Sequence, residues 1–398
     1  MTEPRPAVRL RPNVGAQPFR WGAPWVYADQ LVMDRRTRSL PAGSLVELQD
    51  AERRPLGLAA FNGASKIAVR ALDPDPSAVV DRAWFAARLL RALALRETLF
   101  DAPFYRLIHA EADGLPGVVV DRFGDAAVIQ PNAAWAETRL ADLADALCDL
   151  TGVTTVVKNG AGRARVLEGL PEETAVLSGG LGGPVEVPMN GAVYLADLTG
   201  GQKTGIFYDQ RPNHAFAARL GRGRRVLDVF AHVGGFALAA LAAGAQTALA
   251  VDGSAAALEL ANDGARASGV AERFEVRRGD AFDAMAALGS EGARFGLVVC
   301  DPPAFAPNRA ALEAGLRAYE RVARLAATLV EPDGFLVLCS CSHAADLTRF
   351  REASLRGVGK AGRSATILHT GEAGPDHPVH PHLAETAYLK ALFLRIRS

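Results

Sequence analysis

The segment RVLDVFAHVGGF occupies residues 225–236, and a second apolar segment, ALAVD, occupies residues 248–252. The first carries a carboxylate at Asp228, and the second ends at Asp252. Paired glycines follow the first run and begin a predicted helix, so a ligand can approach the backbone closely there. Near-continuous apolar runs are typical of strands in a parallel sheet, and such sheets bind ligands outside the carboxyl ends of their strands. These residues therefore predict a ligand-binding α/β sheet.

The same alternation of strands and helices continues to the end of the chain. Further strands are predicted at residues 274–276, 297–300 and 335–338, with helices between them. Regular alternation of this kind is typical of a parallel sheet that is covered by helices on both faces. Residues 201–398 are therefore predicted to form a doubly wound, Rossmann-like sheet, to which the apolar segment 388–396 adds a further strand.

Two other parts are predicted before this sheet. Residues 1–75 contain short segments rich in Val, Leu and aromatic residues that are broken by Gly, Pro and Asp, which predicts a small β-domain. The proline-rich residues 72–77 disfavour a helix and indicate a linker. Residues 76–200 combine an apolar helical stripe with strand patterns and are predicted to form a middle α+β domain. It ends in a hairpin that turns at Asn190-Gly191.

Composition and charge exclude several classes of protein. The chain has 398 residues, of which 49% are hydrophobic and 22% charged, and its formal net charge is zero. No apolar run approaches the ~18 residues that cross a bilayer, and the first residues lack the pattern of a signal peptide. A cytoplasmic protein without membrane contact is therefore expected. Residues 1–70 carry eleven Arg or Lys against six Asp or Glu, which suits either a phosphate-facing module or an ordinary solvated surface.

Acidic residues end or follow four of the predicted strands. They are Asp228, Asp252, Asp280 and Asp301. Asp252 is placed to accept hydrogen bonds from ribose hydroxyls. Asp228 suits the cationic methionine end of S-adenosylmethionine, although an Asp there can also simply cap a turn. A dinucleotide is the competing ligand, but it needs G-x-G-x-x-G for its pyrophosphate, and residues 234–236 offer only Gly-Gly-Phe. S-adenosylmethionine is therefore the predicted cofactor.

A thiol and a carboxylate at neighbouring strand ends indicate the reaction. Cys341 lies in LCSCSH at 338–343, and Asp301 lies in CDPPAF at 300–305. A thiolate that adds to C6 of a cytosine makes C5 nucleophilic enough to attack a methyl sulfonium. A carboxylate can bind the N3/N4 edge of the ring or share its proton, and the target base must be unpaired or flipped out. Cys341, as nucleophile, and Asp301 are therefore the predicted catalytic residues.

Other residues of the same types have alternative interpretations. Cys300 fits a small core residue inside an apolar strand, whereas Cys339 shares a nominal strand face with Cys341 and is a competing nucleophile. His343 could assist proton transfer or be an ordinary surface histidine. The segment HPVHPH at 377–382 is similar to a metal-binding tract, but its prolines and close spacing favour a loop, so no metal is predicted. Four cysteines in so long a chain also exclude a disulfide framework.

A set of motifs runs along nearly the whole chain. They are Arg106-Leu107-Ile108, EADGLPG at 111–117, Asp121-Arg122-Phe123-Gly124, KTGIFYDQR at 203–211, Gly234-Gly235-Phe236, Asp301-Pro302-Pro303, Ser340-Cys341-Ser342, Asp376-His377-Pro378 and Tyr388-Leu389-Lys390. Together they resemble the bacterial 23S ribosomal RNA cytosine-C5 methyltransferases that carry an N-terminal PUA domain. The resemblance implies that residues 1–75 are PUA-like and bind RNA by shape and backbone, that 23S ribosomal RNA is the partner, and that the protein forms a homodimer.

The resemblance also implies roles for single residues. Cys341 corresponds to the family's motif cysteine and Asp301 to its Asp-Pro-Pro carboxylate. The segment from Thr204 to Arg211 is expected to border the cleft, where Arg211 either binds the methionine carboxylate or forms a structural ion pair. The expected cofactor-binding residues are Arg211, Asp228, Phe230, Gly234, Asp252, Asp280 and Asp301. Ala304 departs from the family's frequent Lys, and Val233 departs from a common Thr; the first departure bears on which base is methylated.

Three functions fit these patterns. The first is S-adenosylmethionine-dependent formation of 5-methylcytosine in 23S ribosomal RNA. The second is methylation of an exocyclic base nitrogen, because Asp-Pro-Pro with a nearby Phe305 also resembles sites that orient an amino group. The third is a non-catalytic RNA-binding or ribosome assembly factor that has kept a cofactor fold. Substitution of Cys341 by alanine separates the first two, and calorimetry with S-adenosylmethionine tests the third.

Overall fold

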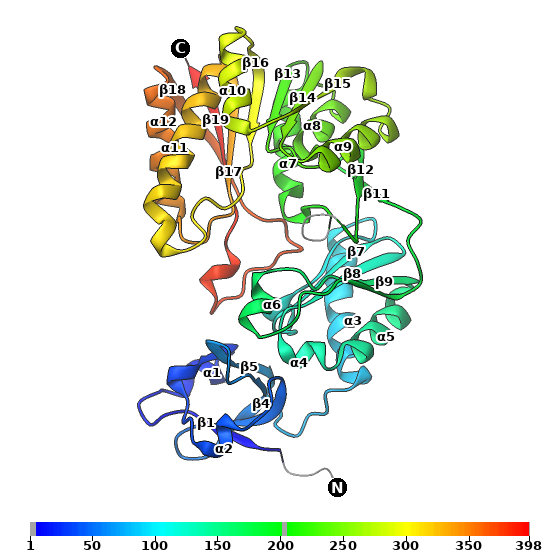
Figure 1. Ribbon diagram of the computed structural model, residues 1–398, viewed down its shortest axis with the longest axis vertical. Helices are drawn as coiled ribbons and strands as arrows, with labels where there is room; N and C mark the ends of the chain where they lie inside the picture. The colour runs from blue at the N-terminus through cyan, green and yellow to red at the C-terminus, as the bar shows by residue number, and fades with distance from the viewer. Residues whose placement is uncertain (1–4, 201–204, 398) are drawn as a thin grey trace. The chain divides into compact units, whose positions relative to one another are not determined.

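The computed structural model describes residues 5–200 and 205–397, and its contacts divide the chain into two compact units (Figure 1). The described residues of unit 1 are 5–183, 198–200 and 378–384, and those of unit 2 are 184–197, 205–377 and 385–397. The predicted domain boundaries after residues 75 and 200 stay predictions. Among the helices that the structure describes, none has the length and apolarity that a bilayer-spanning segment needs.

Unit 1 begins with a small five-stranded sheet in the order β1-β3-β4-β5-β2. Its elements are β1 (Ala7–Arg9), α1 (Gln17–Arg20), β2 (Trp25–Tyr27), α2 (Arg35–Arg38), β3 (Ser44–Gln49), β4 (Pro55–Phe61) and β5 (Ile67–Asp73). β1 pairs in parallel with β3, and the other pairs are antiparallel. Alternate residues such as Val46 and Leu48 of β3 are buried in its core, as the period of two in a strand requires.

The second part of unit 1 is a five-stranded sheet in the order β10-β9-β8-β7-β6, packed against helices. Its elements are α3 (Arg82–Leu99), β6 (Phe104–His109), β7 (Val118–Phe123), β8 (Ala126–Pro131), α4 (Ala134–Glu137), α5 (Leu140–Thr151), β9 (Thr155–Lys158), α6 (Arg163–Leu167) and β10 (Ala175–Ser178). Asp81 is the N-cap of α3, and its side chain accepts a hydrogen bond from Trp84 N–H. The apolar stripe of Phe85, Leu89 and Leu93 then faces the core.

Unit 2 contains a seven-stranded sheet in the order β15-β14-β13-β16-β17-β19-β18. Its elements are α7 (Arg211–Gly221), β13 (Arg225–Val229), α8 (Gly235–Ala242), β14 (Thr247–Asp252), α9 (Ala255–Ala267), β15 (Phe274–Arg278), α10 (Ala281–Ser290), β16 (Phe295–Cys300), α11 (Leu312–Leu329), β17 (Val330–Ser340), α12 (Leu347–Lys360), β18 (Ser364–Gly371) and β19 (Lys390–Arg397). The five strands from β15 to β17 are parallel, whereas β19 is antiparallel to both of its neighbours. The predicted doubly wound sheet is therefore confirmed.

Helices cover both faces of this sheet. α7, α8 and α9 pack together on one side, and α10, α11 and α12 pack together on the other. Leu227 of β13 contributes to the core beneath α10 to α12, so the next residue, Asp228, projects to the opposite face. The strand order reverses between β13 and β16, which is the position where open α/β sheets bind ligands.

The hairpin predicted around Asn190-Gly191 is present and belongs to unit 2. β11 (Val185–Met189) pairs antiparallel with β12 (Ala192–Ala196). The turn residues Asn190 and Gly191 have φ angles of 53° and 79°, as this tight turn requires. β12 packs against α8 and α9, so the hairpin supports the helices that follow the first two strands of the sheet.

Candidate active site

Asp228 lies near the carboxyl end of β13, beside the start of α8. Its side chain is buried, and Oδ2 accepts a hydrogen bond of 2.9 Å from Ala237 N–H. Oδ1 is also buried and has no hydrogen-bond partner among the residues described. Burial raises the pKa of Asp228 to about 7, and the nearby Asp301 and Asp252 carboxylates act in the same direction. Because an unpaired buried acceptor is costly, this position fits a ligand that brings a cationic N–H group.

The loop between β13 and α8 has a constrained backbone. Phe230, His232 and Gly234 have positive φ angles of 64°, 51° and 80°, and non-glycine residues in this region are typical of functional sites. His232 N–H donates to Asp252 Oδ2 at 2.8 Å, and Ser254 N–H donates to Asp252 Oδ1 at 2.8 Å. Asp252 therefore fixes this loop, and each carboxylate oxygen can accept a second hydrogen bond from a ligand.

Asp280 caps α10. Its exposed side chain accepts hydrogen bonds from Phe282 N–H at 2.9 Å and from Asp283 N–H at 3.1 Å. N-terminal capping accounts for an aspartate at this position without any ligand. Its predicted contact with the cofactor stays a prediction.

Asp301 directly follows β16 and opens the Asp-Pro-Pro loop. Its Oδ2 accepts a hydrogen bond of 2.9 Å from Gln210 Nε2. Gln210 is buried, and its Oε1 accepts a hydrogen bond of 2.7 Å from Asn213 Nδ2. Pro302 and Pro303 lack backbone donors and restrict the loop. The carboxylate is therefore positioned from one side by a buried amide and from its own chain by two prolines.

Burial separates the three cysteines near these strand ends. Cys300 and Cys339 are both buried, and burial raises the pKa of each thiol above its ordinary value. Cys341 follows β17 and is partly exposed. Because a thiol must ionise and reach its substrate to act as a nucleophile, this arrangement favours Cys341 over the competing Cys339.

Ser342 joins the Cys341 loop to the Asp-Pro-Pro loop. Its Oγ accepts a hydrogen bond of 2.9 Å from Ala306 N–H and lies 2.6 Å from Tyr319 Oη. Ser340 Oγ donates to the same Tyr319 oxygen at 2.8 Å. All three hydroxyl groups are buried, so α11 fixes the backbone on both sides of Cys341. The structure thus brings the two predicted catalytic loops together.

Lys390 supports the same loop from β19. Its buried Nζ donates to the carbonyl oxygens of Ser342 at 2.8 Å and Ala345 at 2.7 Å. Burial lowers the pKa of Lys390, whereas Cys341 and Asp346 act in the opposite direction. Because both hydrogen-bond acceptors are neutral, an anion nearby would stabilise the buried ammonium. Lys390 therefore places a positive charge in the surroundings of the Cys341 thiol.

Arg211 begins α7, with its guanidinium carbon 5.3 Å from the centre of the Tyr208 ring. Burial lowers the pKa of Arg211, and the Asp376 carboxylate acts against that change. A role in binding the cofactor or in a structural ion pair therefore stays a prediction. Lys203 and Thr204, which belong to the same motif, lie outside the described residues.

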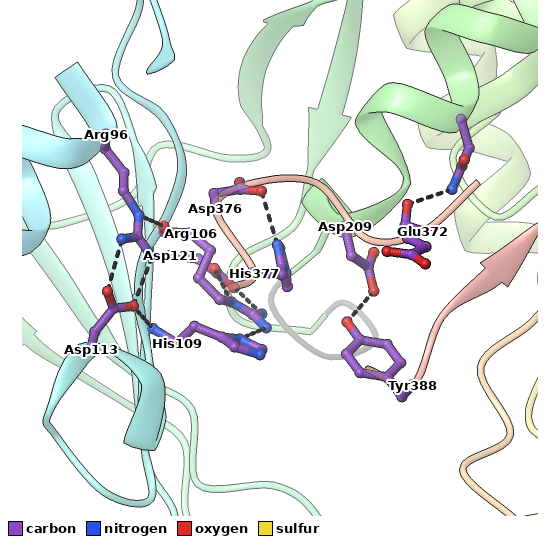
Figure 2. Close-up of polar contacts among 11 residues, drawn as sticks. Arg96, Arg106, His109, Asp113, Asp121, Asp209, Glu372, Asp376, His377 and Tyr388 are labelled. Carbon is purple, nitrogen blue, oxygen red and sulfur yellow. Dashed lines mark hydrogen bonds and ion pairs between the residues drawn. The ribbon is translucent and has the colours of Figure 1, made fainter. Parts of the chain in front are cut away.

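The histidine-rich segment does not form one cluster. His377 Nδ1 lies 2.9 Å from Asp376 Oδ1, and both side chains are buried in unit 2 (Figure 2). His380 and His382 instead belong to unit 1, where His382 Nε2 lies 2.9 Å from the carbonyl oxygen of Trp21. Within the described ranges, no three His, Cys, Asp or Glu residues gather as metal ligands would. His343 is exposed beyond the Cys341 loop.

Sequence reasoning did not assign five residues of this site. They are Gln210, Asn213, Tyr319, Ser342 and Lys390. Gln210, Ser342 and Lys390 lie in the motifs that carry the family resemblance. A lysine at the start of an otherwise apolar strand, such as Lys390, also indicates that its charged side chain is buried. Asn213 and Tyr319 lie in helices and give no comparable signal.

Comparison with protein families agrees with this geometry. A family model described as S-adenosylmethionine-dependent methyltransferase matches residues 137–395, and one described as a PUA-like domain matches residues 8–74. Among solved structures, a methyltransferase complexed with SAH has a TM-score of 0.82 and 18% sequence identity, and the match covers 98% of this chain and 100% of that chain. At this identity the likeness shows the fold alone, and it confirms the predicted fold.

Curated relatives are similar along almost their whole length. Ribosomal RNA large subunit methyltransferase I from Tolumonas auensis is 34% identical over 381 residues, which cover 94% of this chain and 95% of that protein. Ribosomal RNA large subunit methyltransferase from Deinococcus radiodurans is 35% identical over 404 residues, which cover 98% of each. The chain therefore carries a PUA-like domain and belongs to the S-adenosylmethionine-dependent methyltransferases, in the same family as these two relatives.

Proposed function

We propose that this methyltransferase forms 5-methylcytosine in 23S ribosomal RNA, with Cys341 as the nucleophile and Asp301 as the group that binds the base. One observation carries the proposal. The partly exposed Cys341 lies beside Ser342, whose hydroxyl accepts a hydrogen bond of 2.9 Å from Ala306 in the loop of Asp301. A thiol in this place serves methylation of a ring carbon, because the carbon must first be activated by covalent addition.

The relatives support the choice of substrate. Those named above are ribosomal RNA large subunit methyltransferases and cover nearly the whole chain. The PUA-like domain is proposed to bind the RNA by its shape and backbone, and residues 1–70 of the chain carry an excess of basic side chains. Cytoplasmic action on ribosomal RNA belongs to the same proposal.

A homodimer is proposed on the family resemblance alone. Light scattering on the purified protein measures it directly. A mass of two chains supports the dimer, and a mass of one chain at micromolar concentration rejects it.

When bound, S-adenosylmethionine supplies a methyl group on a positively charged sulfonium. Oδ1 of Asp228, which is buried and has no partner within the described part of the chain, fits the ammonium group of its methionine end. Asp252 fits the ribose hydroxyls, and Arg211 fits the methionine carboxylate. The proposed cofactor-binding residues are Arg211, Asp228, Phe230, Gly234, Asp252, Asp280 and Asp301.

Cys341 and Asp301 act on the base in sequence. The Cys341 thiolate forms a bond to C6, and the electrons of the C5–C6 double bond move toward C4 and N3. Asp301, at the N3/N4 edge, accepts a hydrogen bond from the N4 amino group and so holds the ring in place for the attack of Cys341. Transfer of the methyl group to C5 would break its bond to the sulfonium sulfur and leave S-adenosylhomocysteine. A base then removes the C5 proton, and the electrons of that C–H bond re-form the C5–C6 double bond and expel Cys341 as a thiolate. The bond between the Cys341 sulfur and C6 is therefore both formed and broken within one turnover.

Methylation of an exocyclic base nitrogen is the second candidate function. The Phe305 ring lies 6.4 Å from Phe230 and 6.2 Å from Phe282, so an aromatic cluster stands beside the Asp-Pro-Pro loop and could stack on a base. Such a reaction needs Asp301 but no thiol. Substitution of Cys341 therefore separates it from the first candidate.

Bisulfite mapping of 23S ribosomal RNA tests the proposed function. Bisulfite deaminates cytosine but spares 5-methylcytosine, so a protected cytosine should appear in wild-type cells and vanish when the gene is deleted. Wild-type protein should restore the signal, and Cys341→Ala should not. An unchanged map after deletion would reject the substrate, whereas restoration by Cys341→Ala would reject the thiol mechanism.

A further inference from the structure

Asp301 stands at the end of a chain of side-chain amides. Asn213 Nδ2 donates to the carbonyl oxygen of Glu372 at 3.1 Å and to Gln210 Oε1 at 2.7 Å. Gln210 Nε2 in turn donates to Asp301 Oδ2 at 2.9 Å. Figure 2 marks the bond that Glu372 accepts. Gln210 and Asn213 are both about 2% exposed, so water does not compete for these bonds.

The direction of the chain follows from its first member. A backbone carbonyl can only accept, so the group that Asn213 presents to Glu372 must be its NH2. The same NH2 then faces Gln210, which must present Oε1 to Asn213 and its own NH2 to Asp301. This hydrogen-bond pattern assigns both amide orientations. Asp301 Oδ2 is therefore held as an acceptor.

Packing leaves these amides little freedom. A Cβ added to Gly371 would lie 2.0 Å from Asn213 Oδ1, so the glycine makes room for the asparagine. Asn213 lies in the first turn of α7, and Gln210 is the residue before that helix. The neighbouring Asp209 is fixed by a hydrogen bond from the Tyr388 hydroxyl (Figure 2). The segment that carries the amides is thus anchored on both sides.

We propose that Asn213 and Gln210 are positioning residues that fix Asp301 as a hydrogen-bond acceptor, and that they thereby favour a base with an exocyclic amino group. Cytosine presents an N4 amino donor at the edge where uracil presents the O4 acceptor. A carboxylate held as an acceptor attracts the first and repels the second. The inference rests on the role of Asp301 in the proposed function.

Other titratable groups lie near Asp301, and their ionisation must be distinguished from that of Asp301 in the pH dependence of kcat. Cys300 and Cys339 are close enough for Asp301 to raise the pKa of each thiol further. Asp228, whose pKa burial raises to about 7, also interacts with Asp301. Measuring kcat at saturating S-adenosylmethionine removes the contribution of Asp228 to cofactor affinity. Both thiols stay protonated in the acid range. Cys341 must ionise to act and contributes to the acid limb of kcat in every variant, so only a difference in that limb between a variant and the wild type reports on Asp301.

The test compares the pH dependence of kcat in three variants. Gln210→Met keeps the shape but removes the donor, and the acid limb should move to higher pH by about one unit, which lowers kcat about tenfold on the acid side. Asn213→Asp cannot donate, so Gln210 turns its oxygen toward Asp301, and the limb should move at least as far. Asn190→Gly removes a neighbouring amide bond of 2.9 Å to the Arg211 carbonyl and should leave the limb in place.

A measurement of thermal stability tests the hydrogen bond between Gln210 and Asp301 independently of catalytic activity. Gln210 favours the ionised form of Asp301 in the folded protein, so its contribution is present at neutral pH and lost below the ordinary carboxyl pKa of about 4. The loss of thermal stability in Gln210→Met should therefore be constant from pH 7 to about pH 4 and shrink as pH falls below about 4. A loss that is independent of pH, or an acid limb unmoved in both variants, overturns the proposal. Activity that survives Cys341→Ala rejects only the thiol mechanism.

Discussion

The buried ammonium group of Lys390 favours ionisation of the Cys341 thiol. The ammonium group is held by the carbonyl oxygens of Ser342 and Ala345 at 2.8 and 2.7 Å, within the loop that carries the thiol. A positive charge nearby favours the thiolate over the thiol. These two hydrogen bonds fix the position of the ammonium group.

Substitution of Lys390 should change the reactivity of one cysteine only. In Lys390→Met, the pH at which iodoacetamide modifies Cys341 at half its maximal rate should rise by about one to three units. Peptide mass spectrometry follows Cys341 and the partly exposed Cys148 of α5 in the same sample, and Cys148 should not respond. Lys390→Arg, which keeps the charge, should shift Cys341 less. An identical profile for Cys341 in all three proteins would contradict this role of the lysine.

Asp228 should make cofactor binding depend on pH. Because burial raises the pKa of Asp228 to about 7, calorimetry should show that affinity for S-adenosylmethionine increases as pH rises through 7. Asp228→Asn should bind about tenfold or more weakly at pH 8 and lose this dependence. In the apo protein, a raised carboxyl pKa stabilises the fold below pH 4 and this contribution is lost as pH rises through 7. Equal pH slopes in both proteins would contradict the assignment.

At the scale of elements, α7 and α8 meet at Gly235. A Cβ on Gly235 would lie 2.7 Å from both Cε1 and Nε2 of the buried His214, whose ring also lies 4.4 Å from that of Phe236. Burial lowers the pKa of His214 to about 3, so the imidazole packs here as a neutral group. The glycine thus sets how closely the cofactor loop approaches α7.

Gly235→Ala should displace the start of α8. We expect a loss of about 1–3 kcal/mol in the free energy of unfolding, because the core there has no room for a methyl group, together with weaker S-adenosylmethionine binding. Gly289 of α10 is the control, since its added Cβ would meet its nearest atom at 3.9 Å. Gly289→Ala should be neutral or stabilising by up to about 1 kcal/mol. Denaturant unfolding measures both, and equal stabilities would contradict the packing argument.

The elements of unit 2 differ in how well their patterns predict them. β13, β14, β16 and residues 335–338 of β17 are largely buried apolar runs, and the sequence predicts a strand at each of them. β18 is largely exposed and polar, so it lacks such a run. The C-terminal strand is predicted, but its antiparallel insertion between β17 and β18 depends on pairing with residues far away in the chain, which local patterns do not encode.

Among the long-range contacts of the chain, those of Glu168 connect the two sheets of unit 1. Its Oε1 accepts hydrogen bonds from Ser65 at 2.8 Å and Arg70 at 3.1 Å, and its Oε2 accepts one from Asn62 at 3.0 Å. Arg70 also pairs with Glu111, which lies between β6 and β7, at 2.9 Å. These contacts join the first sheet of unit 1 to the second.

Removal of Glu168 should therefore weaken RNA binding without affecting the cofactor. Glu168→Ala leaves buried donors unpaired, and we expect a loss of about 1–3 kcal/mol in stability and a lower affinity for ribosomal RNA. S-adenosylmethionine affinity should be unchanged. Glu313→Ala, which breaks an exposed ion pair with Arg349, should cost about 0.5 kcal/mol or less. Equal RNA affinities for the wild type and Glu168→Ala would contradict the role of this connection.

The sequence predicts the residues of the candidate site that lie at strand ends, but not the residues that form hydrogen bonds to them. Cys341 and Asp301 follow strand ends and Asp228 lies near one, so the rule that ligands bind there predicts them from sequence alone. The amide chain of Gln210 and Asn213 depends on a carbonyl oxygen at Glu372, 159 residues beyond Asn213. Such bonds arise from the packed fold, so no local pattern contains them.

Trapping a covalent bond between Cys341 and cytosine tests the proposed thiol mechanism. In RNA that carries 5-fluorocytosine at the bisulfite-mapped position, fluorine cannot leave as a proton does, so the thiol cannot be expelled after methylation. Incubation with S-adenosylmethionine should give a stable protein–RNA adduct that mass spectrometry locates on Cys341, and Cys341→Ala should give none. An adduct on Cys339, or methylation of unmodified RNA without any adduct on the fluorinated RNA, would contradict the account.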